Sequence, residues 1–600
     1  MTSQSATALP TATRRVRLRF DEKGDPAFAS VKSPECFKQH ARGVLPPPDV
    51  IPVIFVPGVM GSNICQKDGS EKVWSPPNSA VSGVWAGITG GFWSAKKRHV
   101  VFDPDNTEVD PTGPCPISPY NYWIDEGEAK RRMWGALHAD SYHSFMARLE
   151  EQLNDQYVNP GAQEVHLISQ LGMLEYLGGG PSKTENYRAH AWQTMPDYAT
   201  FAQKAVNAWG AQPKALSKGE IKRVGDYYYP VWAFGYNWLR SNEEAANELI
   251  EYINTEVLKR YEGKYFRHQG KVILITHSMG GLVGRRAAQI APDKILGVIH
   301  GAQPVMGAPV LYRRFRSGME IDGFFDIPGR VFAGIAGGTE EKVAAQIACA
   351  PGPLELAPTC DYPPHWLKIA FKTRTIHKGS GIFNPSVKQA GDVIFTAPER
   401  NPYLEIYSKT TDKCWWGLAH PENLDPSERL KGDNLDPVKV FKKAVTDAES
   451  FHGTLKRHAH PMTYGFYGND DNKHRTFGHV TWHVPELERC TLRPSELPHL
   501  RAVGYGSGTV KLPIPSYDGS KDSVVTKPVE VKLSNERNQS GDGTVPFDSG
   551  TWLEKLEPKP QEVLAFPGFD HQGAFSYRYA AEATVYFLAR IIQKAKPPVS

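Results

Sequence analysis

A short apolar strand that ends on a serine and runs directly into a helix is the feature that most restricts how this chain can fold. Residues 272–275 read Val-Ile-Leu-Ile, Thr276-His277-Ser278-Met279-Gly280 follows, and residues 281–288 are typical of a helix. A strand, a tight turn and a helix in this order lift the serine to the edge of a sheet and point the helix N-terminus at it. We therefore predict that Ser278 is a nucleophile. The alternative is a structural serine in a tight turn.

One position departs from the usual form of this turn. Its first glycine is replaced by Thr276, so the motif reads T-x-S-x-G. A small residue is needed there because the strand and the helix pass close together. We expect threonine to fit.

A second glycine-rich turn follows another apolar run. Residues 51–56 predict a buried parallel strand, which runs into Pro57-Gly58-Val59-Met60-Gly61. Free backbone N–H groups in such a turn stabilise an oxyanion without reorganisation. We assign the two donors to the N–H of Val59 and the N–H of Met279. The alternative is an ordinary strand-to-loop turn.

An acid and a base are expected after the serine, in that order. Asp542 lies between two glycines, and His571 follows the strand-like run 563–566. Histidine supplies the base because its pKa is near neutrality, and the carboxylate fixes its tautomer. The alternatives are a turn aspartate and a surface histidine. The rival acids are Asp548 and Asp570, and the rival bases are His452, His458 and His460.

These motifs together resemble one branch of the α/β-hydrolases, which contains lecithin:cholesterol acyltransferase-type enzymes, GPI-inositol deacylases and bacterial lipases. Within this branch the chain is most similar to type VI secretion lipase effectors. Asn237 stands where the family has aspartate. The matching segments follow the family's order and are residues 57–62, 234–240, 276–280, 352–358, 464–468, 541–546 and His571.

The resemblance implies a serine lipase or phospholipase that attacks the acyl esters of membrane phospholipid. It also implies an α/β-hydrolase fold, a secretion machinery that delivers the protein and an immunity protein that neutralises it. Two other functions remain open. One is an acyltransferase or glycolipid deacylase that shares the acyl-enzyme, and the other is a binding scaffold whose chemistry has lapsed.

Charge and length set further limits. The 600 residues carry 69 Lys and Arg against 65 Asp and Glu, a net charge of +4, which gives no case for nucleic acid. The acidic segments 103–110 and 469–472 do not match a calcium loop, so we expect turns there and neither a metal nor a cofactor. The seven cysteines include Cys349 and Cys360, which we expect to be unpaired thiols.

The order of the motifs predicts a hydrolase core interrupted twice. We assign residues 1–45 to an N-terminal extension, and residues 46–64, 221–309 and 456–600 to a mainly parallel sheet with helices on both faces. Residues 65–220 and 310–455 are predicted insertions that form a cap or lid; the alternative is surface decoration. Residues 141–153 have the spacing of an amphipathic helix.

The chain shows no layout of a signal peptide and no apolar run long enough to span a bilayer. We therefore expect synthesis in the cytoplasm without a signal peptide. For an effector of the class it resembles, delivery to the periplasm of a target cell would follow.

Overall fold

The fold is given by a computed structural model. It describes residues 12–29, 39–76, 93–118, 121–154, 216, 218–319, 336–372, 374–377, 386–389, 391–411, 413–487, 490–517 and 524–598. Parts of the predicted N-terminal extension, of the insertion 65–220 and of the insertion 310–455 lie outside these residues.

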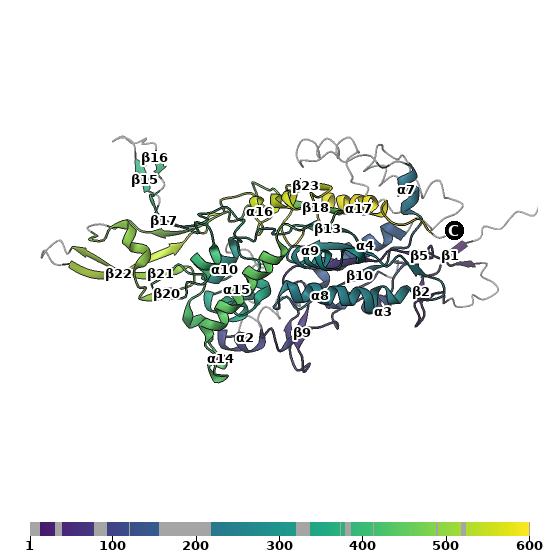
Figure 1. Cartoon of the computed structure of the whole chain (residues 1–600), viewed down its shortest axis with the longest axis horizontal. Helices are drawn as coiled ribbons and strands as arrows, with labels where there is room; N and C mark the ends of the chain where they lie inside the picture. Colours follow the sequence, from purple (N-terminus) through teal and green to yellow (C-terminus); the bar gives the residue numbers. More distant parts are fainter. Residues whose placement is uncertain are drawn as a thin grey trace, which may run out of the picture.

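A six-stranded parallel sheet forms the centre of the molecule (Figure 1). All neighbouring strands in it pair in parallel, as expected for strands that read as short apolar runs. In spatial order the strands are β10 (Val231–Ala233), β6 (Val53–Val56), β12 (Val272–His277), β13 (Ile295–Gly301), β18 (Thr463–Gly468) and β23 (Glu562–Phe566).

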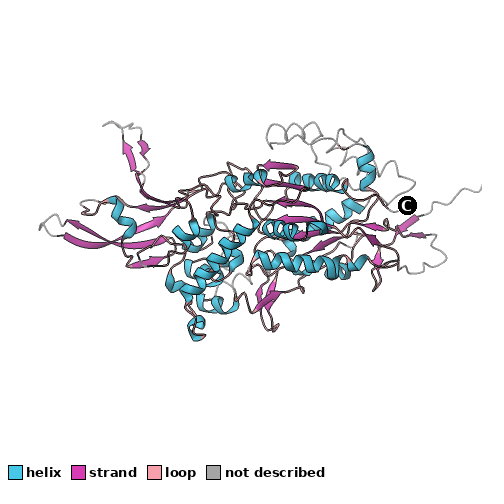
Figure 2. Cartoon of the chain, viewed as in Figure 1, coloured by secondary structure: helices cyan, strands magenta, loops and turns pink. Residues whose placement is uncertain are grey.

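Helices cover both faces of this central sheet, as the colouring of Figure 2 shows. Ile54 and Val56 belong to one buried cluster, and Val53 and Phe55 belong to the other, because alternate strand residues point to opposite faces. The first face packs against α8 (Asn242–Tyr252) and α9 (Gly280–Ile290). The second packs against α4 (Ala139–Asn154) and α17 (Arg578–Ile592). The predicted α/β class is confirmed.

Local sequence explains where these helices begin. Ser241 caps α8, since its hydroxyl accepts a hydrogen bond from the N–H of Glu243, and acidic residues occupy the first turn. The helix α4 covers the predicted amphipathic segment 141–153 and buries Tyr142, Phe145 and Leu149 along one stripe.

A second six-stranded sheet lies at the opposite end of the molecule from the C-terminus (Figure 1). It is mostly antiparallel, except that β14 and β19 pair in parallel. The sheet takes strands from both sides of the predicted boundary at 455/456, and the division into domains stays a prediction. Its order is β17 (Val393–Ala397), β14 (Leu367–Phe371), β19 (Val480–Val484), β22 (Val524–Leu533), β21 (Thr509–Tyr517) and β20 (Gly504–Gly506).

The described parts of the two predicted insertions contact each other. Helix α2 (Ala95–Val101) packs against α12 (Glu340–Ile347). Nearby, the Nδ1 atom of His99 lies 3.5 Å from the carboxylate of Asp425, and Arg429 forms an ion pair with Asp103. These contacts join two segments that are distant in the sequence. Whether they cover the site as a lid stays a prediction.

Smaller elements complete the described fold. No helix in the described ranges is both long enough and apolar enough to cross a bilayer. Cys349 and Cys360 are free thiols. The remaining strands and α-helices are β1 (Ala12–Arg15), β2 (Arg19–Phe20), β3 (Pro26–Ala27), β4 (Gln39–Arg42), β5 (Asp49–Val50), β7 (Ile64–Gln66), β8 (Lys72–Trp74), β9 (Thr107–Val109), α3 (Glu126–Arg131), α7 (Lys218–Val224), β11 (Arg267–His268), α10 (Val310–Ser317), α13 (Pro351–Leu354), β15 (Arg374–His377), β16 (Ser386–Gln389), α14 (Arg429–Gly432), α15 (Pro437–Leu455) and α16 (Phe547–Thr551).

Candidate active site

Ser278 occupies a strained turn between β12 and α9. Its φ of 52° lies in the left-handed region, which a serine adopts only when the surrounding structure requires it. The serine N–H donates a hydrogen bond of 2.9 Å to the carbonyl of Gly301 on the neighbouring strand. This conformation is the one that a nucleophile elbow needs, because it holds the side chain clear of both the strand and the helix.

Gly284, in the second turn of α9, explains why Thr276 fits between the strand and the helix. A Cβ atom on Gly284 would lie 2.7 Å from the Cγ2 methyl of Thr276. The helix therefore approaches the strand at a glycine, and the methyl of the threonine fills the space. The threonine hydroxyl is also satisfied, at 2.8 Å from Nδ1 of His300.

The three predicted triad residues form one hydrogen-bonded chain. The Oγ atom of Ser278 lies 2.8 Å from Nε2 of His571, and Nδ1 of the same ring lies 2.8 Å from Oδ2 of Asp542. Since the carboxylate only accepts, Nδ1 carries the proton and Nε2 is left to accept from the serine hydroxyl. The side chain of Asp542 is fully buried, whereas that of His571 is 15% exposed and so accessible to a reactant.

The loop of Asp542 is itself held in place. Its Oδ1 atom accepts hydrogen bonds from the N–H groups of Thr544 and Val545, and its carbonyl accepts one from the N–H of His571. The aspartate therefore both forms its own turn and contacts the histidine loop. The sequence left two alternatives for Asp542, a turn aspartate or a partner of His571. The structure shows both features at once.

The rival acids and bases have other partners. Asp548 accepts from the side chain of Gln539, and Asp570 accepts from the N–H of Gly573. Nε2 of His452 contacts the carbonyl of Glu355. Nδ1 of His460 accepts from the N–H of Met462, and the carbonyl of His458 accepts from Arg285.

The turn after β6 lies against the serine, as the proposed oxyanion site requires. A Cβ atom on Gly58 would lie 2.9 Å from Cβ and 3.4 Å from Oγ of Ser278, so only glycine permits this approach. A Cβ on Gly280 would lie 2.4 Å from the carbonyl of Pro57. Within the described part of the chain, the N–H groups of Val59 and Met279 have no hydrogen-bond acceptor, so both can donate to an oxyanion.

Two further residues beside the triad were not predicted from the sequence. Nε2 of His277 lies 2.9 Å from the carbonyl of His571, and its Nδ1 lies 3.0 Å from the hydroxyl of Tyr142. His277 was visible as the neighbour of Ser278 on the strand. Nothing in the sequence connects it to Tyr142 on α4, 135 positions away.

The acidic segments form turns. Oδ1 of Asp103 accepts from the N–H of Asp105, and Oδ1 of Asp470 accepts from the N–H groups of Asn472 and Lys473. Asp470 also pairs through its backbone with Gly541 beside Asp542. Across the described ranges, no group of three or more His, Cys, Asp or Glu residues could hold a metal ion.

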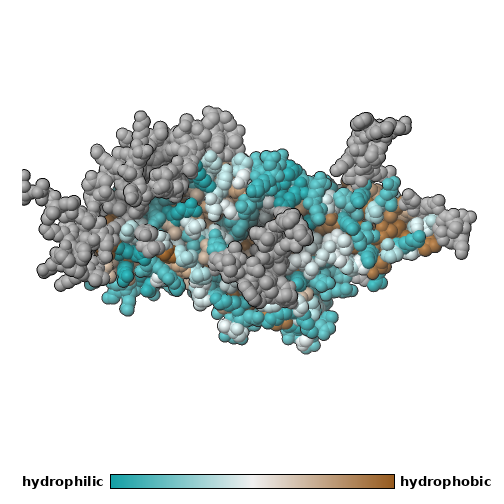
Figure 3. All heavy atoms as spheres, turned by 180° about the vertical axis from the view of Figure 1, so that it is seen from behind, coloured by the Kyte–Doolittle hydropathy of each residue, from teal (hydrophilic) through white to brown (hydrophobic). Residues whose placement is uncertain are grey.

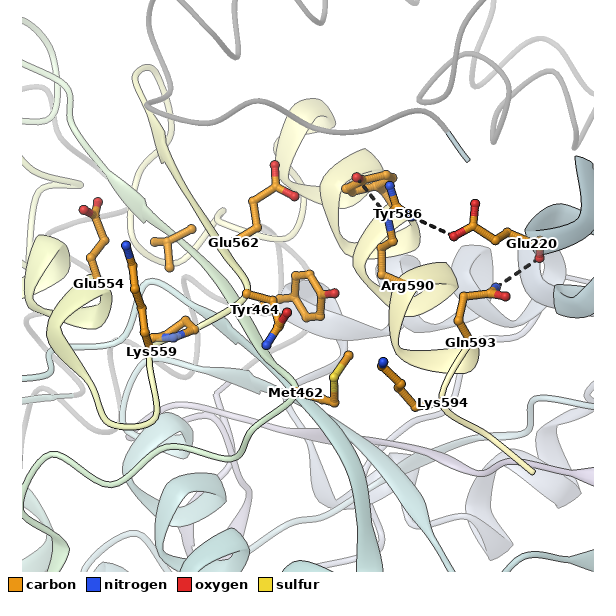
Figure 4. Close-up of a pocket in the computed structure, with 13 residues that line it drawn as sticks. Glu220, Met462, Tyr464, Glu554, Lys559, Glu562, Tyr586, Arg590, Gln593 and Lys594 are labelled. Atoms are coloured by element: carbon orange, nitrogen blue, oxygen red, sulfur yellow. Dashed lines mark hydrogen bonds and ion pairs between the residues drawn. The ribbon is translucent and has the colours of Figure 1, made fainter. Parts of the chain in front are cut away.

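A cavity of about 540 Å³ lies at the N-terminal end of the core strands, whereas Ser278 follows the C-terminal end of β12 (Figure 4). It is lined by Tyr464 and Glu562, near the starts of β18 and β23, and by Arg590 of α17. Burial raises the pKa of Glu562 to about 7. Arg590 contacts Tyr586 and Glu220, so its charge is already engaged. None of the three predicted triad residues lines this cavity.

Comparison with known proteins adds to the geometry. No protein-family model matches the chain. A solved structure described as the crystal structure of Tle4-Tli4 complex matches it with a TM-score of 0.63 and 25% identity, over 90% of this chain and 98% of the other. The chain resembles a type VI secretion lipase effector. The resemblance predicted from the motifs is thereby confirmed, and it extends over nearly the whole length of both chains.

Proposed function

We propose that this protein is a serine ester hydrolase with an α/β-hydrolase core, acting as a phospholipase effector on membrane lipid. The observation that carries the proposal is the chain of hydrogen bonds from Ser278 through His571 to Asp542, with two distances of 2.8 Å. The strained elbow, the close approach of Gly58 and the similarity to Tle4 support it.

In the proposed mechanism, Oγ of Ser278 attacks the carbonyl carbon of an acyl ester while Nε2 of His571 takes its proton. The N–H groups of Val59 and Met279 stabilise the oxyanion of the tetrahedral intermediate. The protonated histidine then gives its proton to the departing alcohol, and an acyl-serine remains. Water then gives a proton to His571 and attacks the acyl carbon. His571 returns that proton to Oγ of Ser278 as the fatty acid is released. Asp542 stabilises the imidazolium in both halves.

The two insertions are proposed to act as a lid that shields the acyl chain from water. The contacts of α2 with α12, and of His99 with Asp425, support a single cap made from both segments. A lidded site favours aggregated lipid over a soluble short-chain ester. The rate of hydrolysis is therefore expected to rise sharply when the substrate concentration passes the micellar threshold.

The effector role follows from the similarity to one partner of the Tle4-Tli4 complex. By analogy, we propose that a dedicated secretion machinery delivers this protein to the periplasm of a target cell. An immunity protein would neutralise it in the cell that produces it. Expression directed to the periplasm of a bacterium should then be toxic, cytoplasmic expression much less so, and Ser278→Ala harmless in both places.

Two assays test the chemistry. A fluorophosphonate probe should label the folded wild-type protein at Ser278, and absence of labelling would favour a lapsed scaffold. Lipid mass spectrometry on mixed bacterial phospholipids should show free fatty acid and lysolipid. Transfer of the acyl group to an alcohol, with no free fatty acid, would favour the acyltransferase instead.

A further inference from the structure

Four groups form a directed chain of hydrogen bonds beneath the triad. The carbonyl of His571 can only accept, so Nε2 of His277, at 2.9 Å, must carry the proton of that ring. Nδ1 of His277 is then an acceptor, and the hydroxyl of Tyr142, at 3.0 Å, donates to it. The tyrosine oxygen in turn lies 3.5 Å from the N–H of Gly58, a long contact. Every donor in this chain faces an acceptor.

Burial supports these protonation states. Tyr142 and His277 are each 1% exposed. Desolvation lowers the pKa of His277 to about 3, with a smaller contribution from His571, and raises the pKa of Tyr142 to about 12. Both side chains are therefore neutral near pH 7, where the direction of these hydrogen bonds is fixed.

The two ends of this series of hydrogen bonds contact the two parts of the site whose relative position matters most. One end is the backbone of the histidine that contacts Ser278, and the other is Gly58, the residue before the proposed oxyanion donor Val59. The first turn of α4 makes further contacts with the same loops. Ser141 accepts from the side chain of Gln572, and a Cβ on Gly61 would lie 2.8 Å from the tyrosine oxygen.

We propose that Tyr142 and His277 are positioning residues that hold the loop of His571 and the Gly58 turn at fixed places on either side of Ser278. This inference rests on the proposed hydrolase function. Neither side chain takes part in proton transfer to the substrate. They act by fixing where the base and the oxyanion donors stand, and a misplacement of about 1 Å can cost on the order of 100-fold in rate.

The experiment compares two substitutions of His277 in the full-length chain. His277→Leu removes both hydrogen bonds at similar volume, whereas the amide of His277→Gln can still donate to the carbonyl of His571. With a soluble p-nitrophenyl ester, His277→Leu should lower kcat roughly 100-fold while KM changes little. His277→Gln should recover most of that loss. The rate of fluorophosphonate labelling should follow the same order, because it reports the attack of Ser278 alone.

Tyrosine variants provide a test if His277→Leu does not fold. Tyr142→Phe removes one oxygen from the chain and should lower kcat roughly tenfold, about the effect of one lost hydrogen bond. Tyr229→Phe is the matched control, since it removes a buried hydroxyl that donates to Val224, and it should leave kcat unchanged. Thermal midpoints are measured for all variants.

The outcomes separate this inference from the proposed function. Absence of labelling in the wild-type protein would overturn the proposed function. If the wild-type protein is labelled and both Tyr142→Phe and His277→Leu keep the kcat of the wild type, the positioning role alone is overturned. A His277→Gln variant as slow as His277→Leu would also overturn it, as would losses of rate that follow only the thermal midpoint, with Tyr229→Phe as slow as Tyr142→Phe.

Discussion

The two six-stranded sheets differ in how their strands pair and in how much of each strand is buried. Every residue of β6, β12, β13 and β18 in the core sheet is buried. The second sheet is mostly antiparallel, and the first five residues of β22 are exposed. Figure 3 shows apolar surface at the end of the molecule that carries this sheet, where Tyr517 and Val524 are each more than half exposed.

This contrast bears on where the candidate triad residues meet. In a parallel sheet all strands end at the same edge, so the loops that follow them meet there. Gly58 follows β6, Ser278 follows β12 and His571 follows β23, and these residues lie together although they come from distant parts of the chain. An antiparallel sheet sends neighbouring strand ends to opposite edges. Asp542 is the exception among the candidate triad residues, since the strand that precedes it in the chain is β22 of the second sheet and it contacts His571 from there.

The largest expected difference between the sheets concerns activity. Ser278→Ala should lower kcat for ester hydrolysis on the order of a millionfold, because the attacking oxygen is lost. Its thermal midpoint should stay close to that of the wild type. The matched control is Ser516→Ala on β21, which should change neither quantity. A purified, folded Ser278→Ala protein with substantial hydrolysis would remove this serine from the mechanism.

Next in size is the effect of the buried carboxylate. Asp542→Asn should lower kcat on the order of 10⁴-fold, since the amide favours the wrong tautomer of His571. Asp548→Asn and Asp570→Asn should keep near-normal rates, because these carboxylates contact Gln539 and Gly573 instead. Steady-state kinetics on all three variants decide the question. An inactive Asp548 or Asp570 variant beside an active Asp542→Asn would show that another carboxylate is the acid.

A smaller difference between the two sheets is expected in how substitutions change the free energy of unfolding. Ile275 on β12 is fully buried, so Ile275→Ala should lower the free energy of unfolding by about 2–5 kcal/mol through lost burial and a cavity. Denaturant unfolding followed by circular dichroism measures the change. A loss below about 1 kcal/mol would mean that the core can collapse around the missing atoms.

The smallest effect is expected at the exposed end of the second sheet. Val524 on β22 is 52% exposed, so Val524→Thr should change the free energy of unfolding by less than about 0.5 kcal/mol. The β-branched shape is kept, which isolates the loss of apolar surface. The same unfolding experiment as for Ile275→Ala applies. A large destabilisation would show that this end of the strand is covered by other parts of the molecule.

The sequence indicated the core much better than it indicated the second sheet. The core strands β6, β12 and β23 were predicted from the runs 51–56, 272–275 and 563–566, because continuous apolar runs indicate buried parallel strands by themselves. The strands β14, β19, β21 and β22 were not predicted. In β21 two prolines, Pro513 and Pro515, interrupt the pattern, and β22 carries Lys527, Pro528 and Glu530. Such residues are depleted in strands, so the local pattern does not indicate strands here, although β21 and β22 pair along their length.

By itself, the sequence determined the elbow, the order of the candidate triad residues and the α/β class, because these depend on local runs and on turn residues. The tertiary structure decided which of three carboxylates meets His571, since that choice depends on the turn 542–545 being held against the histidine loop. It also placed Tyr142 of α4 against His277, two residues 135 positions apart. A hydrogen bond between distant segments depends on the packing of whole helices and strands, and no local pattern encodes it.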